Sequence, residues 1–361
     1  MPHLPELRPP KQAAGPKSPV PRPAAGPKTP APGKAKAPVK VPPEVQQASK
    51  SAHLGGYVKI QRVGVGSMGE VYKAWDLKEG RWVALKILRS QDPTQLARFI
   101  REAQVASQMQ HPNITPIYDA GKDKGLWYLA MKYLSGHTLK KFPRGNRRIS
   151  VQLMRDAARA LEYAHSRGII HRDLKPDNFM VRSKPKPGKE ASKAIDDFVH
   201  HIWVMDFGIA RPSESTSQLT MPGTVMGSPS FMSPEQALGK IVDARADVYS
   251  LGATLYQRLT GVPPFESKSI FEALRRVQEE MPKPPSQLEK GIDAGLDAIV
   301  MKCLEKDPAK RYQTAGELAE ALDGWLTPAV VATGDAVPKK KGCGGAAVLL
   351  IAAAAAAAAF A

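Results

Sequence analysis

The chain has 361 residues, 42% of them hydrophobic, which is enough for one large two-lobed domain or two ordinary domains. The formal net charge is +18, and the N-terminus lacks the continuous apolar region of a secretory signal peptide. The two cysteines, Cys303 and Cys343, are too few for a disulfide framework and have no partners at metal-ligand spacing. This usage fits a reducing compartment, with Cys303 interpreted as a small buried hydrophobic residue.

Residues 1–52 are predicted to form a disordered basic tail. Residues 1–50 contain nine Lys or Arg, two acidic residues, 14 of the 33 prolines and no Phe, Trp or Tyr. Such a segment buries too little apolar surface to offset its chain entropy. Its charge would attract an anionic membrane surface or nucleic acid. Because no aromatic residues stand between the charges, nucleic acid is not expected as a partner, and a solvated tether is the preferred interpretation.

From Tyr57 to Leu88, apolar runs alternate with glycines and predict strand, loop, strand, turn and strand. Residues 64–71 read G-V-G-S-M-G-E-V, in which the glycines allow the backbone to approach phosphate oxygens closely. A similar loop occurs in dinucleotide-binding folds, where it opens a helix. Residues 70–75 alternate like a strand instead, which favours a phosphate-binding hairpin.

The remaining elements follow in order. Asp92-Pro93 predicts the start of an amphipathic helix, and residues 111–132 predict short strands. Ser150 is the predicted N-cap of a second helix that ends at Gly168. From about residue 241 onward the pattern is mostly helical. A strand-rich first part and a helix-rich second part, with the chemistry at their junction, predict a two-lobed α+β enzyme.

Two short motifs carry the chemistry. Residues 171–178 read H-R-D-L-K-P-D-N, and residues 206–208 read D-F-G. They supply two carboxylates, one ammonium and one amide, a set suited to moving a phosphoryl group from a metal-bound nucleotide to a hydroxyl. One carboxylate orients the hydroxyl and accepts its proton, while the ammonium neutralises the moving charge.

With its motifs in order from about Tyr57 to Trp325, the chain resembles the eukaryotic-type (Hanks-type) serine/threonine protein kinase family, in particular its bacterial branch. The resemblance implies a two-lobed kinase fold with a β-rich N-lobe at about 53–134 and an α-helical C-lobe at about 135–327. It also implies ATP with Mg²⁺, or Mn²⁺ as an alternative, protein substrates bearing Ser or Thr, and a role in bacterial signalling.

The resemblance assigns a role to each site residue. Asp173 is the expected catalytic base, Lys175 the γ-phosphate ligand, and Lys86 the α/β-phosphate ligand paired with Glu102. The expected metal ligands are Asn178 and Asp206. The expected nucleotide-binding residues are Val63, Gly64, Gly66, Ser67, Gly69, Val71, Ala84, Lys86, Met131, Tyr133 and Met180.

Other matching positions are expected to be structural or regulatory. His171 is interpreted as a buried structural residue, and Asp247 as the brace of the loop around Asp173. A bridge is expected between Glu235 and Arg311. The family usually carries a large apolar residue where this chain has Ala106, which would loosen the packing there. Activation by autophosphorylation is hypothesised at Thr220 or Thr224.

Two segments depart from the kinase plan. Asn178 and Asp206 stand 28 positions apart, about twice the usual separation, and the surplus at about 183–201 is expected to loop out between two strands. Residues 328–345 form a linker with a basic cluster, and the 16 apolar residues 346–361 are a predicted membrane anchor. They span roughly 24 Å as a helix, against roughly 30 Å of hydrocarbon core, and Gly342–Gly345 would lengthen them.

Three lysines before the apolar segment predict the cytoplasmic side of the cell membrane for the kinase. Two alternatives for residues 346–361 stay open. They could form an alanine-rich helix packed elsewhere, or a frayed tail of a cytoplasmic protein.

Two other functions compete with an active enzyme. One is a catalytically dead scaffold, and the other is a nucleic-acid-binding protein with a kinase attached. The five chemical positions all carry the expected residue type, which a dead scaffold would not need. Those positions are Lys86, Glu102, Asp173, Asn178 and Asp206. The sequence gives no indication of the oligomeric state.

Overall fold

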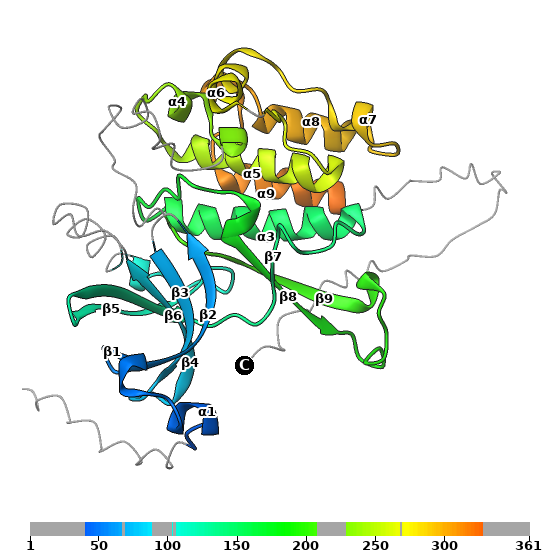
Figure 1. Ribbon diagram of the computed structural model, residues 1–361. Coiled ribbons are helices and arrows are strands. Elements are labelled where there is room, and N and C mark those ends of the chain that lie inside the picture. Colours follow the sequence, from blue (N-terminus) through cyan, green and yellow to red (C-terminus); the bar gives the residue numbers. More distant parts are fainter. Residues whose placement is uncertain are drawn as a thin grey trace, which may run out of the picture.

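Two sheets and a group of helices divide the protein into two lobes (Figure 1). The structure is a computed structural model that describes residues 40–66, 69–88, 103, 106–207, 229–267 and 269–327. The N-lobe holds a six-stranded sheet with the order β1-β2-β3-β4-β6-β5. The C-lobe holds most of the helices and a three-stranded sheet with the order β7-β8-β9.

Antiparallel neighbours build the N-lobe sheet, and they confirm the predicted strands at 57–88 and 111–132. The strands are β1 (His53–Leu54), β2 (Tyr57–Gly66), β3 (Gly69–Asp76), β4 (Arg81–Leu88), β5 (Ile117–Asp123) and β6 (Leu126–Lys132). Val83 and Leu85 alternate into the buried core of this sheet together with Ala130. The period of two in the sequence therefore places alternate residues of β4 on the two faces.

The prediction of a disordered segment through residue 52 is wrong for residues 40–52. They form α1 (Pro43–Gln46) and the 3₁₀ helix η1 (Lys50–Ala52). Val45 is buried in one cluster with Val58 and Trp75, so the segment covers apolar side chains of the N-lobe sheet. Val41, Ala48 and Ala52 pack against the same cluster, so a few apolar side chains hold this proline-rich segment on a sheet that already presents an apolar surface. Residues 1–39 lie outside the described part, as do the helix start predicted at Asp92-Pro93 and the segment 328–361.

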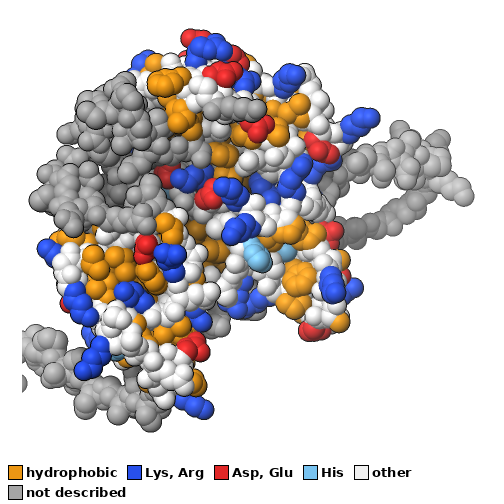
Figure 2. All heavy atoms as spheres, in the orientation of Figure 1, with side chains coloured by type: hydrophobic (Ala, Val, Ile, Leu, Met, Phe, Trp, Pro, Cys, Tyr) orange, Lys and Arg blue, Asp and Glu red, His pale blue; other side chains and the backbone are white. Residues whose placement is uncertain are grey.

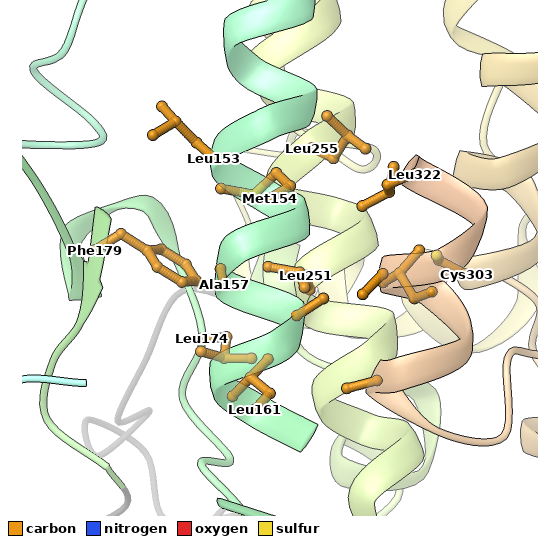
Figure 3. Packing of buried hydrophobic residues seen from close by; sticks show 14 of the residues in the cluster. Leu153, Met154, Ala157, Leu161, Leu174, Phe179, Leu251, Leu255, Cys303 and Leu322 are labelled. Atoms are coloured by element: carbon orange, nitrogen blue, oxygen red, sulfur yellow. The ribbon is translucent and has the colours of Figure 1, made fainter. Parts of the chain in front are cut away.

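The C-lobe core lies between α3 (Arg147–His165), α5 (Ala244–Thr260), α8 (Ala294–Cys303) and α9 (Ala315–Leu326) (Figure 3). Cys303 is fully buried there, which confirms its interpretation as a buried hydrophobic residue. A Cβ atom on Gly252 would lie 2.2 Å from the Cβ atom of Cys303, so glycine permits the close approach of α5 and α8. The other helices are α4 (Pro234–Ala237), α6 (Ile270–Glu279) and α7 (Pro285–Leu288), with short η5 (Pro229–Phe231) and η6 (Pro308–Lys310).

Helix α3 begins several residues before the predicted start at Ser150. The N-cap is Asn146, whose side-chain oxygen accepts a hydrogen bond from the Arg148 N–H at 2.8 Å. Ser150 is buried inside the first turns, and its hydroxyl donates to the Arg144 carbonyl. The prediction of Ser150 as N-cap is wrong. Asparagine caps a helix as well as serine does, and the two arginines that follow Asn146 have a good helix propensity, so the helix starts there.

The surplus segment at 183–201 lengthens a hairpin of the second sheet. That sheet consists of β7 (His137–Thr138), β8 (Phe179–Pro185) and β9 (Phe198–Val204), with η3 (Ile195–Asp197) before β9. Pro185 pairs with Phe198 at the outer end of the β8–β9 ladder. The hairpin therefore extends away from the rest of the C-lobe beneath α3 (Figure 1).

A buried ion pair joins α4 to the segment after η6, as the sequence predicted for Glu235 and Arg311. The guanidinium of Arg311 donates to both carboxylate oxygens of Glu235, at 2.7 and 2.8 Å. Arg311 also donates to the Glu305 carbonyl. Two parallel charge-assisted hydrogen bonds fix the orientation of α4 in the C-lobe.

Candidate active site

The glycine-rich hairpin and the lysine of β4 lie on neighbouring strands in one register. Gly64 pairs with Val71 across β2 and β3, and Val71 pairs with Lys86 across β3 and β4. Ala84 pairs in turn with Met131 of β6. The register thus brings the expected phosphate-binding lysine beside the expected nucleotide-binding residues of the N-lobe. Val63 and Gly66 lie on the same hairpin, whose tip residue Ser67 lies outside the described residues.

Gly69 shows why the hairpin requires a glycine at its return. A Cβ atom at this position would lie 1.8 Å from the carbonyl oxygen of Ile87. Any side chain would therefore force β3 away from β4. The third glycine of the motif is needed for the packing of two strands as well as for approach to a ligand.

The catalytic-loop side chains converge within hydrogen-bonding distance. The ammonium of Lys175 lies 2.9 Å from the Asp173 carboxylate, and the Asn178 amide nitrogen donates to the Asp173 carbonyl at 2.7 Å. The 3₁₀ helix η2 (Pro176–Asn178) turns the chain back so that Asn178 can reach Asp173. Met180 follows two residues later on β8, and Tyr133 follows β6.

Lys86 and Asp206 join the two halves of the site. The distance between Nζ of Lys86 and Oδ1 of Asp206 is 3.0 Å. Burial alone would raise the pKa of Asp206, but the charge and hydrogen bond of Lys86 hold this pKa below its ordinary value. Asp206 is therefore an anion at neutral pH. Glu102, the expected partner of Lys86, lies outside the described residues.

Asn178 and Asp206 offer an amide oxygen and a carboxylate to a metal ion. The Asn178 nitrogen already donates to Asp173, so its side-chain oxygen is the atom left to act as a ligand. Hard oxygen donors of this kind suit Mg²⁺, which commonly takes one or two protein ligands and completes its shell with water and phosphate oxygens. The donor set therefore fits a metal–nucleotide complex.

The backbone of the catalytic loop is held by a fully buried carboxylate, as the sequence predicted for Asp247. It accepts hydrogen bonds from the backbone N–H groups of His171 and Arg172, at 2.8 and 2.9 Å. His171 is itself buried, its ring nitrogen lies 2.7 Å from the Met205 carbonyl oxygen, and its ring contacts Phe207. The loop before Asp173 and the segment before Asp206 are thereby tied together.

Sequence reasoning missed two residues that support this brace. The imidazole of His165 lies 2.8 Å from the Asp247 carboxylate. Gln236 of α4 donates its side-chain amide to the Arg172 carbonyl at 2.8 Å. Neither residue belongs to a recognisable motif, and no local pattern in the sequence could have identified them.

Ala106 is buried and lines a small cavity between the lobes. The cavity is otherwise lined by Met109, Thr115, Ile117, Leu129, Met131, Asp206 and Phe207. The predicted phosphorylation sites Thr220 and Thr224 lie outside the described residues.

The protein kinase domain family matches residues 57–322 of this sequence. The chain belongs to this family. The serine/threonine-protein kinase PknB of Mycobacterium leprae is 42% identical over 272 residues, which cover 72% of this chain and 41% of that protein. A probable serine/threonine-protein kinase of Streptomyces coelicolor is 40% identical over 299 residues, covering 78% of this chain and 42% of that protein.

The solved kinase domain of PknI from Mycobacterium tuberculosis has a similar fold. It is 29% identical, with a TM-score of 0.58, and the match covers 77% of this chain and 99% of that one. The kinase fold expected from the resemblance is thus confirmed. The chain spans 41–43% of the length of the PknB proteins from Mycobacterium that it matches. Within the described residues, none of the helices has the length and apolar character that a bilayer span requires.

Replacing Asp247 by Asn should lower the free energy of unfolding by about 2 kcal/mol at pH 7, because three hydrogen bonds lose their charged acceptor. Burial alone would raise the pKa of Asp247, but the hydrogen bond and charge of His165 and the charge of His171 lower this pKa. A lowered folded pKa stabilises the protein above the unfolded value of about 3.9, and this contribution is lost as pH falls through the folded pKa.

The stability difference between wild type and Asp247→Asn should therefore stay constant above about pH 5 and shrink below about pH 4. Urea unfolding between about pH 3.5 and 7 measures it. Glu320→Gln, at an exposed position of α9, is the control and should show no such trend. A difference that grows on acidification would contradict the assigned role of Asp247.

Proposed function

We propose that the chain is a serine/threonine protein kinase that transfers the γ-phosphate of ATP to Ser or Thr hydroxyls of proteins in bacterial signalling. The observation that carries the proposal is the convergence of Asp173, Lys175 and Asn178 within 2.7–3.2 Å. The Lys86–Asp206 pair supplies the second half of the site at 3.0 Å. Membership of the protein kinase family and the similarity to kinases named for serine and threonine support the same function.

Each residue of the site has a task in that reaction. The Asp173 carboxylate accepts a hydrogen bond from the substrate hydroxyl and then its proton, which aligns the oxygen with the phosphorus. The Lys175 ammonium, 2.9 Å from Asp173, offsets negative charge that develops on the transferred group. Lys86 releases Asp206 in order to bind nucleotide phosphates, and Asp206 and Asn178 become available as metal ligands. A bound Mg²⁺ would neutralise the phosphate oxygens.

Two ion pairs join the charged side chains of the site. Lys175 is paired with Asp173, and Lys86 is paired with Asp206. In the proposed complex with nucleotide, the same four side chains would surround the phosphates and the metal ion. Mutual neutralisation keeps four charges in a partly buried cleft at low cost. We infer that nucleotide binding exchanges these pairs for phosphate and metal contacts, with ATP and Mg²⁺ as the preferred combination and Mn²⁺ as a substitute.

Asp173→Asn should lower the turnover number with a generic basic protein substrate by about 10²–10⁴-fold, because the amide cannot accept the hydroxyl proton. Affinity for Mg²⁺–ATP should change little. Radiolabel transfer measures the rate, and calorimetry measures nucleotide binding. Asp177→Asn is the matched control, because this half-buried neighbour pairs with Lys140 at 3.3 Å. Retention of more than a tenth of the wild-type rate in Asp173→Asn would contradict the assignment.

We also propose that autophosphorylation in the segment between Asp206 and Glu235 activates the enzyme. Arg172 stands next to the catalytic aspartate, and a phosphate on Thr220 or Thr224 is a ligand of suitable charge for it. The support for this proposal is the sequence alone, since both threonines lie outside the described residues.

Replacing both Thr220 and Thr224 by Ala should lower turnover by at least about tenfold after preincubation with Mg²⁺–ATP, because the ordering charge is lost. Mass spectrometry of the preincubated protein identifies the modified residues. The double variant Ser213→Ala and Ser215→Ala, in the same segment, serves as control and should keep wild-type turnover. Equal turnover of all three proteins would refute the regulation.

For localisation, we propose that residues 346–361 attach the kinase to the cytoplasmic side of the cell membrane. The support is a sequence of 16 apolar residues preceded by Lys339, Lys340 and Lys341, which would also favour an anionic surface. Protein substrates and the membrane surface are then the two partners of the chain.

Removal of residues 339–361 should move the protein from the membrane fraction of cells to the soluble fraction, because the apolar segment and its basic flank are lost together. Immunoblotting of the two fractions measures the shift. A variant with Lys339, Lys340 and Lys341 replaced by Gln separates the charge from the apolar segment and should remain largely in the membrane fraction. An equal distribution of full-length and truncated protein would argue against the anchor.

A further inference from the structure

A groove of about 590 Å³ lies outside the active site, between α3 and the lengthened hairpin. Its lining comes from the first half of α3, including Arg148 and Ile149, and from Phe198, Val199 and His200 of β9. Figure 2 shows hydrophobic side chains at the surface of the hairpin, and Val199 is 49% exposed. The volume is in the range that accommodates several side chains of a ligand.

One wall of the groove is an unpaired strand edge. The Val204 N–H and carbonyl bond to Asn113 and Thr115 on the edge of β9 that faces away from β8. Alternation along the strand points the backbone groups of His200 to the same edge. Among the described residues, neither the N–H nor the carbonyl of His200 has a backbone partner there, and the same is true of the Ile202 N–H. The backbone pairing of β9 with Asn113–Thr115 therefore ends at Val204, and it does not reach the part of β9 that lines the groove.

The chain itself passes the groove where α9 ends. The Arg148 guanidinium, which lines the groove, donates to the Leu326 carbonyl in the last turn of α9. One turn earlier, Asp323 is bound to Arg155 at 3.1 Å, and Arg155 also lines the groove. The end of α9 therefore lies beside the groove.

The sequence that follows Thr327 has the composition of a strand. Residues 328–333 read P-A-V-V-A-T, with three β-branched residues and no charge. A segment of about five residues spans roughly 17 Å when extended, and Thr327 and Pro328 connect its start to the end of α9. An edge strand accepts such a segment through main-chain hydrogen bonds, while alternate side chains enter the groove.

We propose that residues Ala329–Thr333 add to the outer edge of β9 as a further strand, with Val330 or Val331 in the groove against α3. This internal docking goes beyond the kinase activity. It covers the open edge of the hairpin and attaches the linker with Lys339–Lys341 to a fixed place on the C-lobe. Added strands protect exposed edges from pairing with other chains, which explains how an enzyme tolerates the lengthened hairpin.

The test compares the full-length protein with the double variant Val330→Asp and Val331→Asp. Backbone hydrogen exchange with single-residue readout should be about tenfold faster at His200 and Ile202 in the variant, because aspartate is disfavoured in strands and its charge is costly to bury beside Ile149 and Phe198. Ala347→Asp with Val348→Asp is the control in the same tail and should leave both amides protected. Equal thermal midpoints and equal kinase activity show that the variants are folded.

A peptide with the sequence of residues 327–335, added to the Val330→Asp, Val331→Asp protein, should restore slow exchange at His200 and Ile202. Identical exchange in wild type and variant would overturn the proposal, because the segment would then not cover the edge. Protection of the wild type that depends on protein concentration would also overturn it and would identify a second copy of the chain as the occupant.

Discussion

The buried carboxylate of Asp247 is the constraint on which the catalytic geometry depends. It accepts hydrogen bonds from two successive backbone amides, those of His171 and Arg172, at a point where the backbone of Arg172 is left-handed with φ of 64°. A non-glycine residue holds this conformation only when its surroundings compensate for the strain. The next residue is Asp173, so the direction of the proposed base is set by a side chain 74 positions away on α5.

A second constraint connects the lobes through Lys86 and Asp206. Lys86 is held in β4 by pairing with Val71 and Leu129, and Asp206 follows β9 with a left-handed backbone of its own, φ 55°. The N-lobe sheet positions the Lys86 ammonium, and the C-lobe sheet positions the Asp206 carboxylate. The distance between these two groups therefore depends on how the two lobes are placed relative to each other. At 3.0 Å the Lys86 ammonium and the Asp206 carboxylate form an ion pair that joins the two lobes.

The sequence predicted the site better than it predicted the elements around it. The motifs H-R-D and D-F-G are short and contiguous, so the resemblance to the kinase family could assign roles to Asp173 and Asn178, and to Asp247 in its own helix, without knowledge of the packing. Packing is decided by distant residues instead. The burial of Val45 against Trp75 depends on a surface that residues 40–52 do not encode, and the start of α3 depended on a choice between two suitable caps, Asn146 and Ser150. The contacts of His165 and Gln236 were likewise beyond any local pattern.

The lengthened hairpin shows how an insertion is stabilised by the fold that receives it. Its strands β8 and β9 already form part of the C-lobe core through Phe179 and Ile202, so each added residue pair extends an existing ladder. Just before β9, Ile195 of η3 packs back on the C-lobe core, and a side chain on Gly145 would collide with it. These contacts attach the hairpin to the C-lobe on both sides of the groove beside α3. The open edge of β9 is a liability unless something pairs with it.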